Sequence, residues 1–195
     1  MKRGAMLVVA DVKSARFDTY GNRGFLPFSL DDDRNFRGYS LDDAIRLSVL
    51  KVASESTDVA AAAHLARHCL DKLAPLHPLF PTDATPLFGA LIRLNWKDAP
   101  EGHNGLDVVA GRWCDLSDLI AERVAFWGAE SVSSVLALPL SDIAKSVFRR
   151  AREFGLPEGD NLPGVPEDLT GFPAWFVASE VARRELFLNW DREEK

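Results

Sequence analysis

The chain has 195 residues, of which 47% are apolar and 27% charged, which is ordinary for a globular protein. No apolar run reaches the 18 residues of a transmembrane helix, and Asp11 and Lys13 interrupt the short apolar run near the N-terminus, so neither a membrane span nor a signal peptide is expected. The two cysteines, Cys69 and Cys114, form no disulfide framework and fit a reducing compartment. We therefore expect a cytoplasmic protein.

The net charge of −6 is divided unevenly along the chain. Residues 1–74 contain 11 Lys and Arg against 10 Asp and Glu, a net charge of +1, whereas residues 75–195 contain 12 against 19, a net charge of −7. No part is strongly basic, so electrostatic attraction alone predicts only modest affinity for nucleic acid.

Two short helices are predicted first, over residues 3–10 and 12–23. In the second, Phe17 and Tyr20 lie three residues apart and share a face, whereas Lys13, Arg16 and Arg23 are expected to reach outward. Gly24 ends this helix, because glycine tolerates the left-handed conformation of a helix stop.

Residues 28–39 are predicted to form a β-hairpin with an acidic tip at residues 31–33. Arg34 and Arg37 alternate with aromatic residues in its returning arm. Ser40 and Asp43 resemble a capping box and start a helix over residues 41–54. A fourth helix follows over residues 58–73, capped by Asp58 or Thr57.

This order of elements resembles the DNA-binding domain of the MerR family, the mercury-resistance-type regulators, over roughly residues 3–73. The family's second helix ends in a glycine followed by apolar residues and proline, here Gly24, Phe25, Leu26 and Pro27. Its wing and capped helix correspond here to Phe36, Arg37, Tyr39, Ser40, Asp43, Arg46 and Leu47.

The resemblance implies a winged helix-turn-helix that places residues 12–23 in the DNA major groove and the wing arginines on phosphates. The expected DNA-binding residues are Lys13, Arg16, Tyr20, Arg23, Arg34, Arg37 and Tyr39, and the ring of Tyr39 is also expected to pack the wing onto the domain. Double-stranded DNA is then the partner, with a homodimer as the assembly and an unidentified small molecule or protein as a possible effector.

Residues 75–86 are rich in proline and predict a linker between a first domain, residues 1–74, and a second, residues 87–195. His64 and His68 lie four residues apart beside Cys69, but the sequence supplies no further clustered ligands. We expect a surface histidine pair and a buried cysteine, with no bound metal or cofactor.

The second domain is expected to be a small α/β unit with a mixed sheet, which makes the whole chain α+β. Strands are predicted over residues 87–96, 106–113 and 132–138, and the third is expected to be buried because it is almost wholly apolar. The predicted helices span residues 115–127, 141–154 and 174–190, with Asp115 and Ser141 as caps of the first two.

No catalytic or phosphate-binding motif appears in the second domain, so an enzyme is not expected. Its tryptophans are expected in the core or in an oligomer interface, with the lining of a ligand pocket as the alternative. The sequence therefore predicts a DNA-binding transcriptional regulator whose second domain dimerises or senses. Asp18, Gly21, the acidic tip and the net charge of −7 motivate an alternative, a protein-interaction module that has kept the winged-helix fold and lost specific DNA reading.

Overall fold

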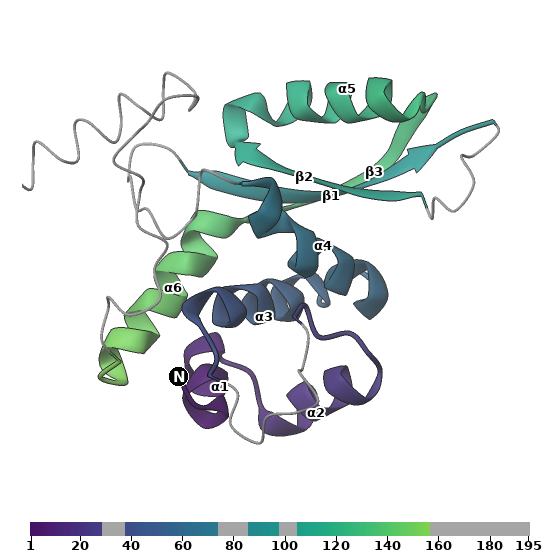
Figure 1. Ribbon diagram of the computed structural model, residues 1–195. Coiled ribbons are helices and arrows are strands. Elements are labelled where there is room, and N and C mark those ends of the chain that lie inside the picture. Colours follow the sequence, from purple (N-terminus) through teal and green to yellow (C-terminus); the bar gives the residue numbers. More distant parts are fainter. Residues whose placement is uncertain (29–37, 74–85, 98–104, 157–195) are drawn as a thin grey trace, which may run out of the picture.

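The computed structural model describes residues 1–28, 38–73, 86–97 and 105–156. The chain is an α+β protein in which four helices precede a β-hairpin, a helix, a third strand and a last described helix (Figure 1). Within the described residues, no helix has both the length and the apolar character needed to cross a membrane.

Helices α1 (Arg3–Ala10) and α2 (Ser14–Asn22) are joined by residues 11–13, and α2 begins two residues later than the sequence predicted. Asp11 takes the left-handed conformation, with φ 54° and ψ 47°, and ends α1. Lys51 Nζ holds the Asp11 carboxylate at 2.6 Å, which fixes this turn against α3. Gly24 follows α2 with φ 70°, and the Phe25 N–H donates to the Tyr20 carbonyl at 2.8 Å, confirming the predicted helix stop.

Helices α3 (Leu41–Ala53) and α4 (Val59–Lys72) begin at the predicted caps. The Ser40 hydroxyl accepts from the Asp43 N–H at 3.1 Å, while the Asp43 carboxylate accepts from the Ser40 N–H at 3.0 Å. The Asp58 carboxylate accepts from the Ala61 N–H at 2.9 Å. Each cap satisfies helix N–H groups that have no partner within the helix.

Replacing Ser40 with alanine is expected to lower the free energy of unfolding by about 1 kcal/mol, because α3 loses its cap. Urea unfolding followed by circular dichroism measures the change. Ser117→Ala on α5 is the matched control, since Ser117 is an exposed residue inside its helix and not its N-cap. Its free energy of unfolding is expected to change by less than about 0.5 kcal/mol. Equal losses in the two variants would contradict the capping role.

The sheet contains strands β1 (Leu87–Asn95), β2 (Leu106–Arg112) and β3 (Ser131–Pro139) in the order β2-β1-β3. Both pairings are antiparallel, so the predicted mixed sheet is wrong. The hairpin brings β2 back antiparallel to β1, and β3 then adds antiparallel to the other side of β1.

Helices α5 (Leu116–Trp127) and α6 (Leu140–Glu153) lack the side-chain caps that the sequence predicted. The Asp115 carboxylate instead accepts from Arg112 Nε and Nη2 at 2.5 and 2.8 Å, across the short 3-10 turn Trp113–Asp115. The Ser141 hydroxyl accepts from the Leu87 N–H at 2.8 Å, so it fastens α6 to the start of β1. In both cases the side chain accepts a hydrogen bond from a residue outside the helix and not from an N–H group of the helix.

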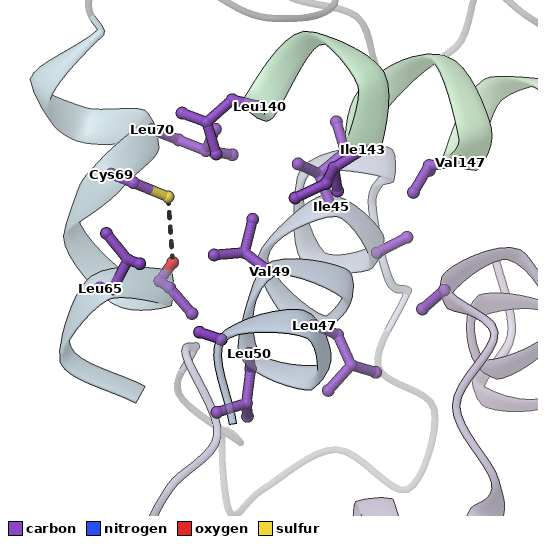
Figure 2. Packing of buried hydrophobic residues seen from close by; sticks show 14 of the residues in the cluster. Ile45, Leu47, Val49, Leu50, Leu65, Cys69, Leu70, Leu140, Ile143 and Val147 are labelled. Atoms are coloured by element: carbon purple, nitrogen blue, oxygen red, sulfur yellow. Dashed lines mark hydrogen bonds between the residues drawn. The ribbon is translucent and has the colours of Figure 1, made fainter. Parts of the chain in front are cut away.

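Helix α5 lies on one face of the sheet, whereas α4 and α6 lie on the other, with α1–α3 beyond them (Figure 1). The main core joins residues of α1–α4, the three strands and α6, whereas α5 packs in a second cluster on the other face of the sheet. In it, Leu140, Ile143 and Val147 of α6 face Ile45 and Val49 of α3 (Figure 2). The division into two domains at the proline-rich stretch stays a prediction, and the core includes residues from both sides of it.

Strand β3 is an edge strand in the described sheet, and the prediction that it is buried is wrong. Only Leu138 of its nine residues is buried, and four of its residues are exposed. Apolar composition alone did not distinguish an edge strand from a central one.

Several predicted features fall outside the described residues. They are wing residues 29–37 with Arg34 and Arg37, linker residues 74–85, and the expected helix over residues 174–190. The winged helix-turn-helix form of the N-terminal domain therefore stays a prediction, and the structure describes its two expected first helices as α1 and α2.

Candidate nucleic-acid interface

Helix α2 has one buried and one exposed face. Phe17 and Tyr20 are 4% and 3% exposed and anchor the helix in the core. The opposite face carries small and polar exposed side chains at helical spacing, namely Ser14, Ala15, Asp18, Thr19 and Asn22. A nine-residue helix is roughly 13 Å long, at about 1.5 Å per residue. Its outer face is therefore narrow, polar and free of bulky groups.

Lys13 and Arg23 lie at the two ends of this face, as the N-terminal and C-terminal caps of α2. Both are exposed. Their exposed positions agree with the prediction that both side chains reach outward. Cations at the two ends of a short helix are suited to the phosphates on either side of a groove.

Arg16 and Tyr20 were also predicted to contact DNA, but their side chains form hydrogen bonds within the protein. Arg16 Nε donates to the Tyr20 hydroxyl at 2.6 Å, and Arg16 Nη2 donates to the Ser54 hydroxyl at 2.8 Å. Tyr20 shares the inner face with Phe17, so its ring is not available on the outer face. Together these bonds tie α2 to the end of α3 and fix the angle at which α2 is presented.

Tyr39 likewise packs inward, which agrees with the packing part of its prediction. Its ring is 7% exposed and lies 5.9 Å from the Phe28 ring and 6.5 Å, edge to face, from the Phe17 ring. The Tyr39 N–H donates to the Met1 carbonyl at 2.8 Å. The described ends of the predicted wing, Phe28 and Tyr39, are thus held together against the inner face of α2.

Asp18 lies in the middle of the exposed face, where a bare carboxylate would repel phosphates. Arg3 of α1 forms an ion pair with it and also donates to the Ser14 hydroxyl at 3.2 Å. The Arg3 guanidinium lies 4.7 Å from the centroid of the Phe17 ring, which holds it in place. The charge of Asp18 is therefore balanced locally.

The N-terminal segment carries more cationic than anionic side chains. Residues 1–28 contain five cations and two carboxylates, a net charge of +3. Both carboxylates are paired, Asp18 with Arg3 and Asp11 with Lys51. The first 28 residues thus carry a net positive charge in a protein whose overall charge is −6.

The sequence prediction did not include Arg3, Ser14, Thr19 and Asn22, which the structure adds to the candidate interface. The positions of Ser14, Thr19 and Asn22 follow from the helical period opposite Phe17 and Tyr20, so that signal was present. Arg3 gave no such signal, because its partner Asp18 is 15 residues away on another helix.

The histidine pair on α4 forms no metal site within the described residues. The His64 and His68 rings have centroids 4.8 Å apart, but no third His, Cys, Asp or Glu of the described segments joins them. Burial lowers the pKa of His68, and burial raises the pKa of the Cys69 thiol to about 12, so Cys69 is a protonated core residue.

No protein-family model matches the chain, and no curated protein is significantly similar to it. The case for a nucleic-acid interface therefore rests on the geometry and charge of α1 and α2 and on the sequence resemblance described above.

Proposed function

We propose that the chain is a DNA-binding transcriptional regulator that inserts α2 into the major groove. The observation that carries the proposal is the outer face of α2, which is small and polar between two exposed cations and has its single carboxylate neutralised by Arg3. A helix entering the major groove needs this combination of close approach, hydrogen-bonding side chains and flanking positive charge.

The described residues suggest a division of roles. Asn22 can make a bidentate contact with adenine, whereas Ser14 and Thr19 can hydrogen-bond to several bases. Lys13 and Arg23 are assigned to phosphates, together with Arg34 and Arg37 of the predicted wing. Arg16 and Tyr20 are assigned to positioning α2, and the base-reading role that the sequence predicted for Arg16 would require its bonds to Tyr20 and Ser54 to break. The C-terminal elements are assigned to dimerisation or to sensing an effector.

Fluorescence anisotropy of labelled random-sequence duplex DNA tests this proposal at low and physiological salt. Saturable binding that weakens steeply with salt is expected, because phosphate contacts release counterions. Lys13→Ala and Arg23→Ala should each weaken binding to all sequences alike and reduce the slope of log K against log salt by about 1.

Arg93→Ala is the matched control, since Arg93 is an exposed arginine of β1 and does not belong to the helices of the candidate interface. It should leave binding and salt slope unchanged. After a preferred site has been selected, Asn22→Ala should reduce discrimination at one base pair by about 1–3 kcal/mol.

The alternative function is a protein-interaction module on the same fold. The net charge of −7 over residues 75–195 favours it, because an acidic segment suits a basic partner. Absence of DNA binding by the wild-type chain at low salt, or an equal loss in the Arg93→Ala control, would refute the DNA-binding proposal and favour this alternative.

A further inference from the structure

A hollow of about 210 Å³ lies where the connection between α3 and α4 meets the sheet. Its inner wall is apolar, because Leu91 is buried and its neighbours Leu106 and Leu136 are half-buried. A volume below the roughly 300 Å³ of drug-sized pockets suits a smaller ligand. The outer rim is polar and is formed by Ser56, Thr57, Arg93 and Ser134.

Among the residues that line the hollow, Arg93 alone is charged. The strand register places Leu106 and Ser134 directly beside it, on β2 and β3. Within the described segments, no carboxylate forms an ion pair with Arg93. By contrast, Arg112 at the end of β2 is paired with Asp115. The hollow therefore carries a positive charge that no described group of the protein neutralises.

The hydroxyl groups on the rim add hydrogen-bond donors. In the described part of the chain, the side chains of Ser56, Thr57 and Ser134 bond to no other protein group. A hydroxyl can donate to an anion, as the guanidinium of Arg93 does with its five N–H groups. The rim is thus suited to an acceptor with a negative charge.

The charge and shape of the hollow define the class of ligand. One guanidinium balances one negative charge, and its planar fork matches the two oxygens of a carboxylate. The leucine wall offers contact to an apolar body, which inorganic phosphate lacks. Because this wall excludes water on one side, an ion pair with Arg93 is stronger here than in open solvent.

We propose that this hollow binds a small organic acid with one carboxylate and an apolar body. The carboxylate accepts hydrogen bonds from Arg93 and from the hydroxyls of Thr57 and Ser134, while the body packs on Leu91 and Leu136. The inference goes beyond the proposed function and does not require that the chain bind DNA. The DNA titrations described above contain no such acid, so Arg93→Ala remains their control.

Calorimetric titration of the full chain with sodium benzoate tests the proposal. Saturable binding with a dissociation constant of about 1 mM or below is expected for a ligand of this size. Benzamide keeps the ring without the charge, and inorganic phosphate keeps a charge without the ring, so each should bind at least about tenfold more weakly. Equal binding of either compound, or no saturation by about 10 mM benzoate, would overturn the proposal.

Variants of the rim test which groups hold the carboxylate. Arg93→Ala should raise the dissociation constant of benzoate at least about tenfold, because charge-assisted hydrogen bonds are lost. Thr57→Val keeps the shape of the side chain without the hydroxyl and should raise it about threefold. Arg149→Ala is the matched control, since Arg149 is an exposed arginine of α6 outside the hollow. Unchanged benzoate binding by Arg93→Ala, or an equal loss in the Arg149→Ala control, would contradict the assigned site.

Amide chemical shifts of the wild-type chain locate the ligand if Arg93→Ala folds poorly. Addition of benzoate should move the resonances of Thr57, Arg93, Leu106 and Ser134 most, because these residues surround the hollow. The largest changes at residues remote from the hollow would show that benzoate binds elsewhere and would overturn the proposal.

Discussion

Gly89→Val is expected to lower the free energy of unfolding by about 3 kcal/mol, at the upper end of the usual cost of overpacking a core. Gly89 lies on the central strand where α4 and α6 meet the sheet. A Cβ atom at this position would lie 2.9 Å from Leu140 Cδ1 and 3.2 Å from Cys69 Cβ. Leu140 and Cys69 are both fully buried, and the Cys69 Cβ is fixed to the α4 backbone, so neither can move aside without shifting a helix.

Urea unfolding of the purified full chain measures this loss. Gly111→Ala is the informative control, because its Cβ would approach only Leu119 Cδ1, the end of a partly exposed side chain that can rotate. Gly4→Ala in α1 meets nothing within 4 Å and should raise stability by about 0.5–1 kcal/mol through helix propensity. If Gly89→Val lowered the free energy of unfolding by no more than Gly111→Ala does, the close approach of α4 and α6 to β1 would not require a glycine at position 89.

Asp107→Ala is expected to cost about 2–3 kcal/mol, because it removes the acceptor of a buried charged network. Asp107 Oδ2 accepts from Arg123 Nε at 2.7 Å and from Trp127 Nε1 at 2.6 Å, while Oδ1 accepts from the Val108 N–H at 2.7 Å. The variant leaves Arg123 and Trp127 without this partner beneath α5. Thermal unfolding followed by tryptophan fluorescence measures the loss, with Asp115→Ala as the surface ion-pair control, for which about 0–1 kcal/mol is expected.

The same network predicts a pH dependence. Burial opposes ionisation of Asp107, but hydrogen bonds from Arg123, Trp127 and the Val108 N–H outweigh it, so the pKa lies below its ordinary value. The unfolded chain therefore binds a proton more readily than the folded one. The stabilisation by Asp107 is complete near neutral pH and declines as the pH falls below about 4, through the lowered pKa of the folded state. Asp107→Asn should match the wild type more closely at acid pH than at pH 7, and a constant difference would argue against the network.

Local signals in the sequence predicted the positions of most described elements. These signals act over at most four residues, through hydrogen bonds or backbone angles, and are therefore visible in the sequence. They include the caps Ser40, Asp43 and Asp58 and the helix stop Gly24. The period of Phe17 and Tyr20 likewise identified the buried face of α2.

The errors arose where a side chain bound another partner than the predicted one: Arg112 is three residues from Asp115, whereas Leu87 is 54 residues from Ser141. Asp115 was assigned to a helix cap and binds Arg112, while Ser141 was assigned to a cap and binds the Leu87 N–H. The exposure of β3 depends on which strand occupies the centre of the sheet, and no local pattern encodes that order. For the candidate interface, the sequence predicted Lys13 and Arg23 on the exposed side. It missed the inward bonds of Arg16 and the neutralisation of Asp18 by Arg3, because both depend on how helices pack.

The bond between Arg150 Nε and the Val9 carbonyl has a consequence for the order of events during synthesis. The two residues are separated by 141 positions, and α6 also supplies part of the core against α1 and α3. At about 5–20 residues per second, the ribosome needs roughly 7 to 28 seconds after making Val9 to reach Arg150. Until then α1 and α3 of the nascent chain lack the apolar residues of α6 that pack against them. A polypeptide cut short before α6 therefore lacks the apolar side chains that pack on α1 and α3, and it should be less stable to proteolysis than the full chain.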